Sequence, residues 1–208
     1  MKREQIEAAA HELREYLAPA CHKTAIAGSL RRREREVCAL DLVLLPRRDH
    51  DLFGAEIPTY GSLGVRLKML LTDGRLDWDT EDPADGPRHK RFRVFPLGGM
   101  VLDLWIAEPT NYGGILALQT GCPEFAAALA TPRQSSGLLP NWMTVYGGRV
   151  WQFGSVSAAN TARAAKNTAG GKALDCPTEA DFFSHLRFLP PCPWERNPNA
   201  AALIRAAF

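Results

Sequence analysis

Apolar residues recur at helical spacing near the start of the chain. Positions 6, 9, 10, 13 and 17 are apolar, and charged residues fill the other faces. This period predicts an amphipathic helix over residues 5–17 that ends near Pro19. Weaker helical patterns, the last with Thr178 as its N-cap, predict helical segments at 30–35, 61–71, 123–129 and 178–186. The early alternation within 61–71 also fits a strand.

Short apolar runs predict strands at 24–27, 40–45, 91–95 and 101–107. A glycine pair at 147–148, flanked by apolar residues, predicts a β-hairpin. Two of the strands are unusual, because each contains one acid, Asp41 or Asp103, between leucines. The order of elements indicates an α/β fold, in which a mixed sheet carries both aspartates and has helices on one side. A smaller α+β lobe is expected at the C-terminal end.

Three segments lack a clear period. Residues 77–87 are acidic and rich in turn formers, and they predict a surface loop. Residues 154–173 are rich in Ala, Ser, Asn, Thr and Gly, contain no acid and carry three basic residues, so a mobile loop with a local charge of +3 is expected. Residues 190–198 form a proline-rich tail.

The overall charge restricts the classes of function. The 208 residues include 25 Lys and Arg against 23 Asp and Glu, a net charge of +2, which argues against a nucleic-acid binder that relies on bulk charge. No apolar stretch is long enough to span a membrane, and the polar start is unlike a signal peptide, so we expect a cytoplasmic protein without a membrane partner. The five scattered cysteines, with no CxxC pair, are expected to be reduced packing residues.

The segment Gly28-Ser29-Leu30-Arg31-Arg32-Arg33 has the composition of a phosphate site. Glycine allows the backbone to approach a ligand, amides at a helix start favour an anion, and arginine adds charged donors. The same residues also occur in ordinary turns, and a run of arginines often forms a solvated face. The segment by itself is consistent with either interpretation.

Asp41 and Asp103 are the candidates for a metal site. An unpaired carboxylate buried in an apolar strand costs several kcal/mol unless a cation meets it. Each aspartate either points outward into solvent or shares a divalent ion through its oxygens. Two such residues, one of them after a Gly-Ser-basic turn, favour the metal site.

Four motifs, taken in order, resemble the X family of DNA polymerases in the polymerase-beta-like nucleotidyltransferase superfamily. They are Gly28-Ser29-Leu30-Arg31-Arg32, Leu40-Asp41-Leu42-Val43, Leu102-Asp103-Leu104, and Thr120-Gly121 followed by Phe125. The resemblance runs from about Ala25 to Arg196 and includes the closing segment 178–196. It is similar to small bacterial and phage forms, which implies a nucleotidyltransferase palm at 1–110 and a thumb-like lobe at 111–208.

The resemblance implies a role for each matching residue. Nucleotide-binding roles fall on Gly28, Ser29, Arg32, Thr120 and Gly121. Asp41 and Asp103 would hold Mg²⁺, with Mn²⁺ as a possible substitute, and the family uses two ions. The expected partners are a nucleoside triphosphate and DNA, either a primer–template or a gapped duplex, as in DNA repair, and the expected state is a monomer.

The carboxylate pattern is incomplete at position 39. In the family, two acids two residues apart on one strand face the same way and share the ions with a third acid on a neighbouring strand. The first of these positions is Ala39 here, and a shifted register would place Val43 second. Alanine cannot bind a metal, so we expect a severe loss of activity. Three explanations for Ala39 are open. The alanine is an engineered knock-out of a catalytic aspartate, or the chain is a natural protein that kept only nucleotide or DNA binding. In the third, the site retains weak activity with a single metal ion.

Two further features bear on the ligands. The family often has two aromatic residues before the Thr-Gly turn, and this chain has Leu118 and Gln119 there. Many members have an asparagine at the position where this chain has Ala126. Basic residues that could contact DNA phosphates, or form solvated basic surface, are Lys90, Arg91, Arg93, Arg163 and Lys166.

We therefore predict a magnesium-dependent, polymerase-X-like nucleotidyltransferase that adds nucleotides to a DNA primer or gap, with its catalytic site weakened at Ala39. One alternative is a catalytically inactive module that binds nucleotide or DNA. Another is a nucleotidyltransferase that acts on a small-molecule or protein hydroxyl. The low net charge favours this last alternative, and the closing segment argues against it.

Overall fold

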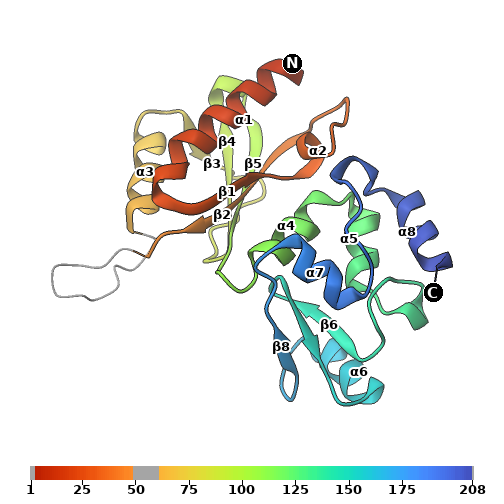
Figure 1. Cartoon of the computed structure of the whole chain (residues 1–208). Coiled ribbons are helices and arrows are strands. Elements are labelled where there is room, and N and C mark those ends of the chain that lie inside the picture. Colours follow the sequence, from red (N-terminus) through yellow and green to blue (C-terminus); the bar gives the residue numbers. More distant parts are fainter. Residues whose placement is uncertain (1–2, 49–60, 208) are drawn as a thin grey trace, which may run out of the picture. The chain divides into compact units, whose positions relative to one another are not determined.

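The computed structural model describes residues 3–48 and 61–207, which form two compact units, Met1–Glu108 and Pro109–Phe208 (Figure 1). Each unit is described by itself below. Within the described ranges, no helix is long and apolar enough to cross a membrane.

The first unit is built on a five-stranded sheet. Its elements are α1 (Arg3–Leu17), η1 (Ala18–Ala20), β1 (Cys21–Ile26), α2 (Gly28–Arg31), β2 (Ala39–Pro46), α3 (Gly61–Thr72), β3 (Leu76–Trp78), β4 (His89–Val94), η2 (Phe95–Leu97) and β5 (Met100–Ile106). The strand order is β1-β2-β5-β4-β3, with β2 and β5 parallel and the other pairs antiparallel. The sheet is therefore mixed, as predicted.

The two faces of this sheet differ in chemistry, because alternate residues of a strand point to opposite sides. One face is apolar and forms a buried core together with α1 and α3. Its strand residues are Leu40, Leu42, Leu44, Phe92, Val94, Leu102, Leu104 and Ile106. Asp41 and Asp103 alternate with these leucines and lie on the other face. The prediction of helices on one side and aspartates in the sheet is confirmed.

The second unit combines helices with a small antiparallel sheet. Its elements are α4 (Tyr112–Thr120), α5 (Pro123–Ala130), η3 (Arg133–Ser135), β6 (Met143–Tyr146), β7 (Arg149–Gln152), α6 (Val156–Ala164), β8 (Lys172–Leu174), α7 (Glu179–Leu186), η4 (Pro193–Glu195) and α8 (Pro198–Ala206). The strand order is β6-β7-β8. The predicted hairpin is β6–β7, and Thr178 caps α7 in a capping box with Asp181.

The predicted mobile loop at 154–173 is wrong. Ser155 caps a helix by accepting a hydrogen bond from the Ala158 amide at 3.1 Å, and the chain continues through α6 into β8. Ala159 and Ala162 are buried in a small cluster with Phe153. The small residues of this segment are typical of a loop in composition, but here they form the packing face of α6. Further elements that the sequence patterns did not predict are β3, α4 and α8.

Helix α4 was missed because its glycines suggest a turn. A Cβ on Gly113 would lie 1.9 Å from the carbonyl carbon of Thr178, and one on Gly114 would lie 1.8 Å from the carbonyl oxygen of Gly148. The side-chain amide nitrogen Nδ2 of Asn111 donates to the Gly147 oxygen at 2.9 Å. The glycines thus allow the backbone of α4 to touch the start of α7 and the β6–β7 turn.

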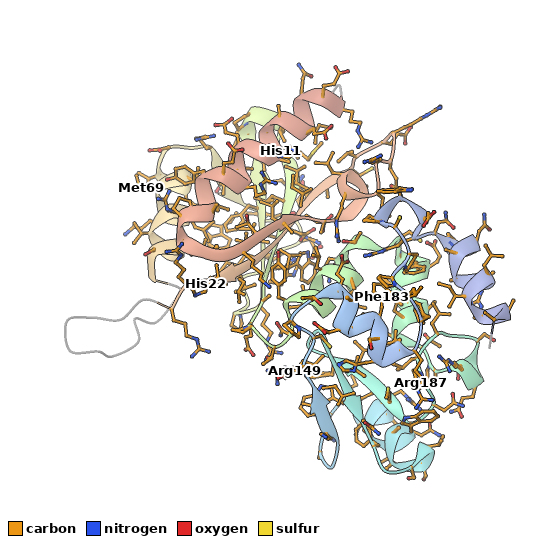
Figure 2. The ribbon with its side chains drawn as sticks, viewed as in Figure 1. His11, His22, Met69, Arg149, Phe183 and Arg187 are labelled. Atoms are coloured by element: carbon orange, nitrogen blue, oxygen red, sulfur yellow. The ribbon has the colours of Figure 1, made fainter. Side chains whose placement is uncertain are left out.

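The closing segment is organised by a buried arginine. Arg196 is 2% exposed and forms an ion pair with Glu179 at 2.5 Å. Its Nε donates to the Pro191 oxygen at 3.1 Å, and its guanidinium lies 5.0 Å from the ring of Phe183, which is labelled in Figure 2. The Arg196 oxygen accepts from the Cys122 amide at 3.3 Å. One side chain and its carbonyl therefore tie the segment after α7 to α7 itself and to the start of α5.

The five cysteines are free, as expected, and two of them, Cys21 and Cys176, are buried packing residues. Cys122 has a capping role, because its Sγ accepts from the Phe125 amide at 3.4 Å at the start of α5. Cys38 and Cys192 are exposed, so packing explains only part of the set.

Candidate active site

Asp41 and Asp103 stand side by side. They are direct partners in the parallel pairing of β2 with β5, so both side chains leave the same face of the sheet on neighbouring strands. Asp103 is 6% exposed and Asp41 is half-buried. The sequence placed one acid in each strand, and the register brings the two acids together.

The environment of Asp41 disfavours its charged form. Burial raises the pKa of Asp41 to about 6, and the negative charge of Asp103 adds to the increase. Opposing contributions come from the indole of Trp105, which donates to Oδ1 at 3.3 Å, and from the charges of Arg32 and His89. A cation bound next to Asp41 would favour the charged carboxylate and lower its pKa.

The turn that contains Gly28 packs directly on Asp41. Gly28 has a φ of +60°, and a Cβ at this position would lie 2.0 Å from Oδ2 of Asp41. The Ala27 amide also donates to the Asp41 carbonyl oxygen at 2.8 Å. Glycine is required here for two reasons, the left-handed backbone and the contact with the carboxylate. The sequence had suggested a third reason, the approach of a phosphate.

Helix α2 is a single turn, and Arg32, which follows it, lies close enough to Asp41 for its charge to lower the pKa of that carboxyl. The Arg32 amide donates to the Gly28 oxygen at 3.1 Å, and the Glu34 amide donates to the Ser29 oxygen at 3.0 Å. The side chain of Arg32 forms an ion pair with Glu34 at 2.7 Å. A phosphate that binds Arg32, as the resemblance implies, would compete with Glu34.

Asp103 is held by two basic side chains of β4. Nε2 of His89 lies 2.6 Å from Oδ1, and Arg91 donates to Oδ1 from Nε at 2.8 Å and to Oδ2 from a terminal nitrogen at 3.2 Å. The imidazole of His89 is stacked on Trp105, with ring centroids 3.9 Å apart and an angle of 4° between the planes. Asp41, Trp105, His89 and Asp103 thus form one connected group.

His89 and Trp105 were not among the predicted site residues, although the sequence contains a signal for both. Trp105 follows Asp103 by two positions and His89 precedes Arg91 by two, so the period of a strand places each on the face of its neighbour. The pairing of His89 with Trp105 across β4 and β5 then completes the group.

The basic residues of β4 are matched by acids of the loop before it. Lys90 forms an ion pair with Asp85, and Arg91 with Asp82 in addition to Asp103. Arg93 forms ion pairs with Asp79 at 3.1 Å and with Glu81 at 2.7 Å. The three side chains predicted to contact DNA therefore already have carboxylate partners within the first unit.

The other predicted contacts lie in the second unit. Arg163 donates to the main-chain oxygens of Asn141 (3.1 Å) and Met143, which ties α6 to β6. Lys166 is exposed just beyond α6. Thr120 is buried at the end of α4, and a Cβ on Gly121 would lie 2.9 Å from Cδ1 of Phe125. The Thr-Gly turn is thus packed against α5.

The residues present fit one divalent cation better than two. Asp41 and Asp103 supply adjacent carboxylates, the donor type that Mg²⁺ prefers. Ala39, which is paired with Val101 and lies two residues before Asp41 on the same face, supplies no oxygen. Within residues 3–48 and 61–207, no group of three or more His, Cys, Asp or Glu side chains is arranged to hold a metal ion. A second ion would lack the third carboxylate that the resemblance implies.

Comparison with known proteins identifies the fold. No protein-family model and no curated protein match the chain. A crystal structure of Leishmania infantum polymerase beta, a ternary P/T complex, matches 95% of this chain and 77% of its own length, with a TM-score of 0.68 and 17% identity. The chain therefore shares the fold of this polymerase beta structure, and the two aspartates lie in the mixed sheet of the first unit.

Proposed function

We propose that the protein is a polymerase-beta-like nucleotidyltransferase that acts on a DNA primer or gap, and that Ala39 weakens its catalytic site. The observation that carries this proposal is the pair of carboxylates, Asp41 and Asp103, on adjacent parallel strands beneath the Gly28 turn. The likeness to a DNA polymerase beta supports DNA as the acceptor.

Each residue of the site has a defined part in this proposal. Asp41 and Asp103 hold a divalent ion, and a bound ion of this kind acidifies an attacking hydroxyl and neutralises a triphosphate. The Gly28–Ser29 turn presents backbone next to Asp41, where a triphosphate that shares the ion would lie. Trp105 and His89 fix the two carboxylates by hydrogen bonds.

Restoring the missing carboxylate tests the proposal. Ala39→Asp is expected to raise magnesium-dependent primer extension on a gapped duplex by about 100-fold or more, because one preorganised charge in an active site contributes that much. Ala39→Asn is the matched control, since it has a similar shape without the charge. Asp41→Asn in the Ala39→Asp background should abolish the gain. If both proteins bind gapped DNA and Ala39→Asp extends no primer, the catalytic proposal is wrong.

A module that only binds is the second candidate. The observation in its favour is that both oxygens of Asp103 already accept hydrogen bonds from Arg91, and that Oδ1 also contacts His89. Arg91 can neutralise Asp103 in the absence of a metal. In that case gapped DNA should bind equally well with Mg²⁺ and with a chelator, and Ala39→Asp should change neither binding nor extension.

A further inference from the structure

The second unit has arginines whose charge no carboxylate balances. Arg205 donates to the Ser136 oxygen at 2.7 Å, and the guanidinium of Arg187 lies 5.1 Å from the ring of Trp142. In the described part of the chain, neither forms an ion pair with an acid. Contacts to a carbonyl or a ring fix the direction of a guanidinium and leave its positive charge uncompensated. The cations of β4 differ, because carboxylates neutralise them.

Arg205 and a further arginine, Arg133, line an open pocket. The pocket has a volume of about 710 Å³ and is lined by Arg133, Ser136, Gly137 and Arg205. Arg133 donates to the Leu186 oxygen at 2.8 Å, which anchors it at the end of α7. Arg187 is the next residue, exposed and in a left-handed conformation (Figure 2). Two arginines therefore line the pocket, a third stands beside it, and no lining residue is acidic.

The arrangement places like charges close together. Burial lowers the pKa of Arg133, and the charge of Arg187 lowers it further. Such a cluster is unfavourable until an anion lies between its members, and guanidinium groups bind phosphate through paired charge-assisted hydrogen bonds. An anion in the pocket would relieve the repulsion between Arg133 and Arg187.

We propose that this pocket binds a phosphate group between Arg133 and Arg205, with Arg187 strengthening the positive field. In the function proposed above, on which this part rests, the phosphate belongs to the backbone of bound DNA. A free phosphate is the other source of the same chemistry.

Salt-dependent DNA binding tests the pocket. Each neutralised phosphate contributes a slope of about 0.9 to the dependence of log K on log salt, and hence a factor of about 8 at 0.1 M salt. The affinity of each protein for a gapped duplex is measured by fluorescence anisotropy at salt concentrations from 50 to 200 mM. At 0.1 M salt, Arg205→Gln should bind about 8-fold more weakly than the wild type, and its slope of log K against log salt should be smaller by about 0.9. Lys68→Gln, an equal change of charge on an exposed position of α3, should match the wild type. Arg205→Lys should recover most of the loss.

Titration with inorganic phosphate separates the two sources. If free phosphate binds, the amide NMR signals of Ser136 and Gly137 shift saturably in the wild type and in Lys68→Gln, and do not shift in Arg205→Gln. The proposal is overturned if Arg205→Gln binds DNA as the control does and phosphate leaves these signals unchanged. Its failure is distinct from failure of the polymerase function, because primer extension by Ala39→Asp does not depend on this outcome.

Discussion

Substitution of Gly28 by alanine tests the contact between the α2 turn and Asp41. The left-handed backbone at Gly28 costs an alanine roughly 1–2 kcal/mol. The new Cβ would also lie 2.0 Å from Oδ2 and 2.9 Å from Cγ of Asp41, which forces local movement. Overpacking of this kind costs about 1–3 kcal/mol. The total expected loss of unfolding free energy is therefore about 2–5 kcal/mol.

Gly74 is a matched control for the cost of the left-handed backbone conformation. Its φ is +66°, close to that of Gly28, and an added Cβ would meet no atom within 4 Å. Gly74→Ala should therefore lose only the roughly 1–2 kcal/mol of the left-handed conformation. Urea unfolding of both variants, followed by circular dichroism, measures the difference.

A double-mutant cycle assigns the remaining loss to the carboxylate. Asp41→Ala removes the oxygen and leaves a Cβ 3.2 Å from the new methyl group, a tight but tolerable contact. Gly28→Ala should then cost about 1–3 kcal/mol less in the Asp41→Ala background than in the wild type. Additive effects of the two substitutions, or equal losses in Gly28→Ala and Gly74→Ala, would refute the reasoning.

Two further predictions concern buried charges. Because the pKa of Asp41 is raised from 3.8 to about 6, its contribution to stability is complete below pH 3.8 and is lost as the pH rises through 6. Between pH 4 and 7 the wild type should therefore lose up to about 3 kcal/mol relative to Asp41→Asn, measured by urea unfolding at both pH values. Arg196→Ala should destabilise the second unit by about 3–5 kcal/mol in urea unfolding, because it breaks the mostly buried ion pair between Arg196 and Glu179. Arg88→Ala, which removes an exposed ion pair at 3.9 Å, should cost less than about 1 kcal/mol in the same urea unfolding measurement.

The strands β1, β2, β4 and β5 of the first unit could be predicted because their pattern is local. Asp41 and Asp103 each interrupt a leucine run, and a period of two places every neighbouring leucine on the opposite face. The same two-residue period places Trp105 and His89 on the face that carries the aspartates. Whether these two side chains meet depends on which strands are neighbours in the sheet. The pairing of β4 with β5 is a long-range property that no local window contains.

The errors in the second unit have a common physical cause. Residues 154–173 and the glycines at 113–114 have the composition of loops, because small residues there serve packing and close backbone contact. Local propensity favours turns at such residues, and tertiary contacts decide otherwise. The contacts concerned are with Phe153, Thr178 and Gly148.

The distribution of ion pairs changes the meaning of the net charge of +2. The basic strand β4 looks like a polyanion surface in the sequence, yet an acidic loop only a few residues earlier neutralises it. Arg187 and Arg205 are isolated in the sequence, and no motif marks them as a binding site. Their contacts are with a ring and a carbonyl oxygen, which leave their positive charge available to an anion. A nearly neutral chain can therefore carry a local phosphate site, because attraction depends on which charges remain uncompensated after folding.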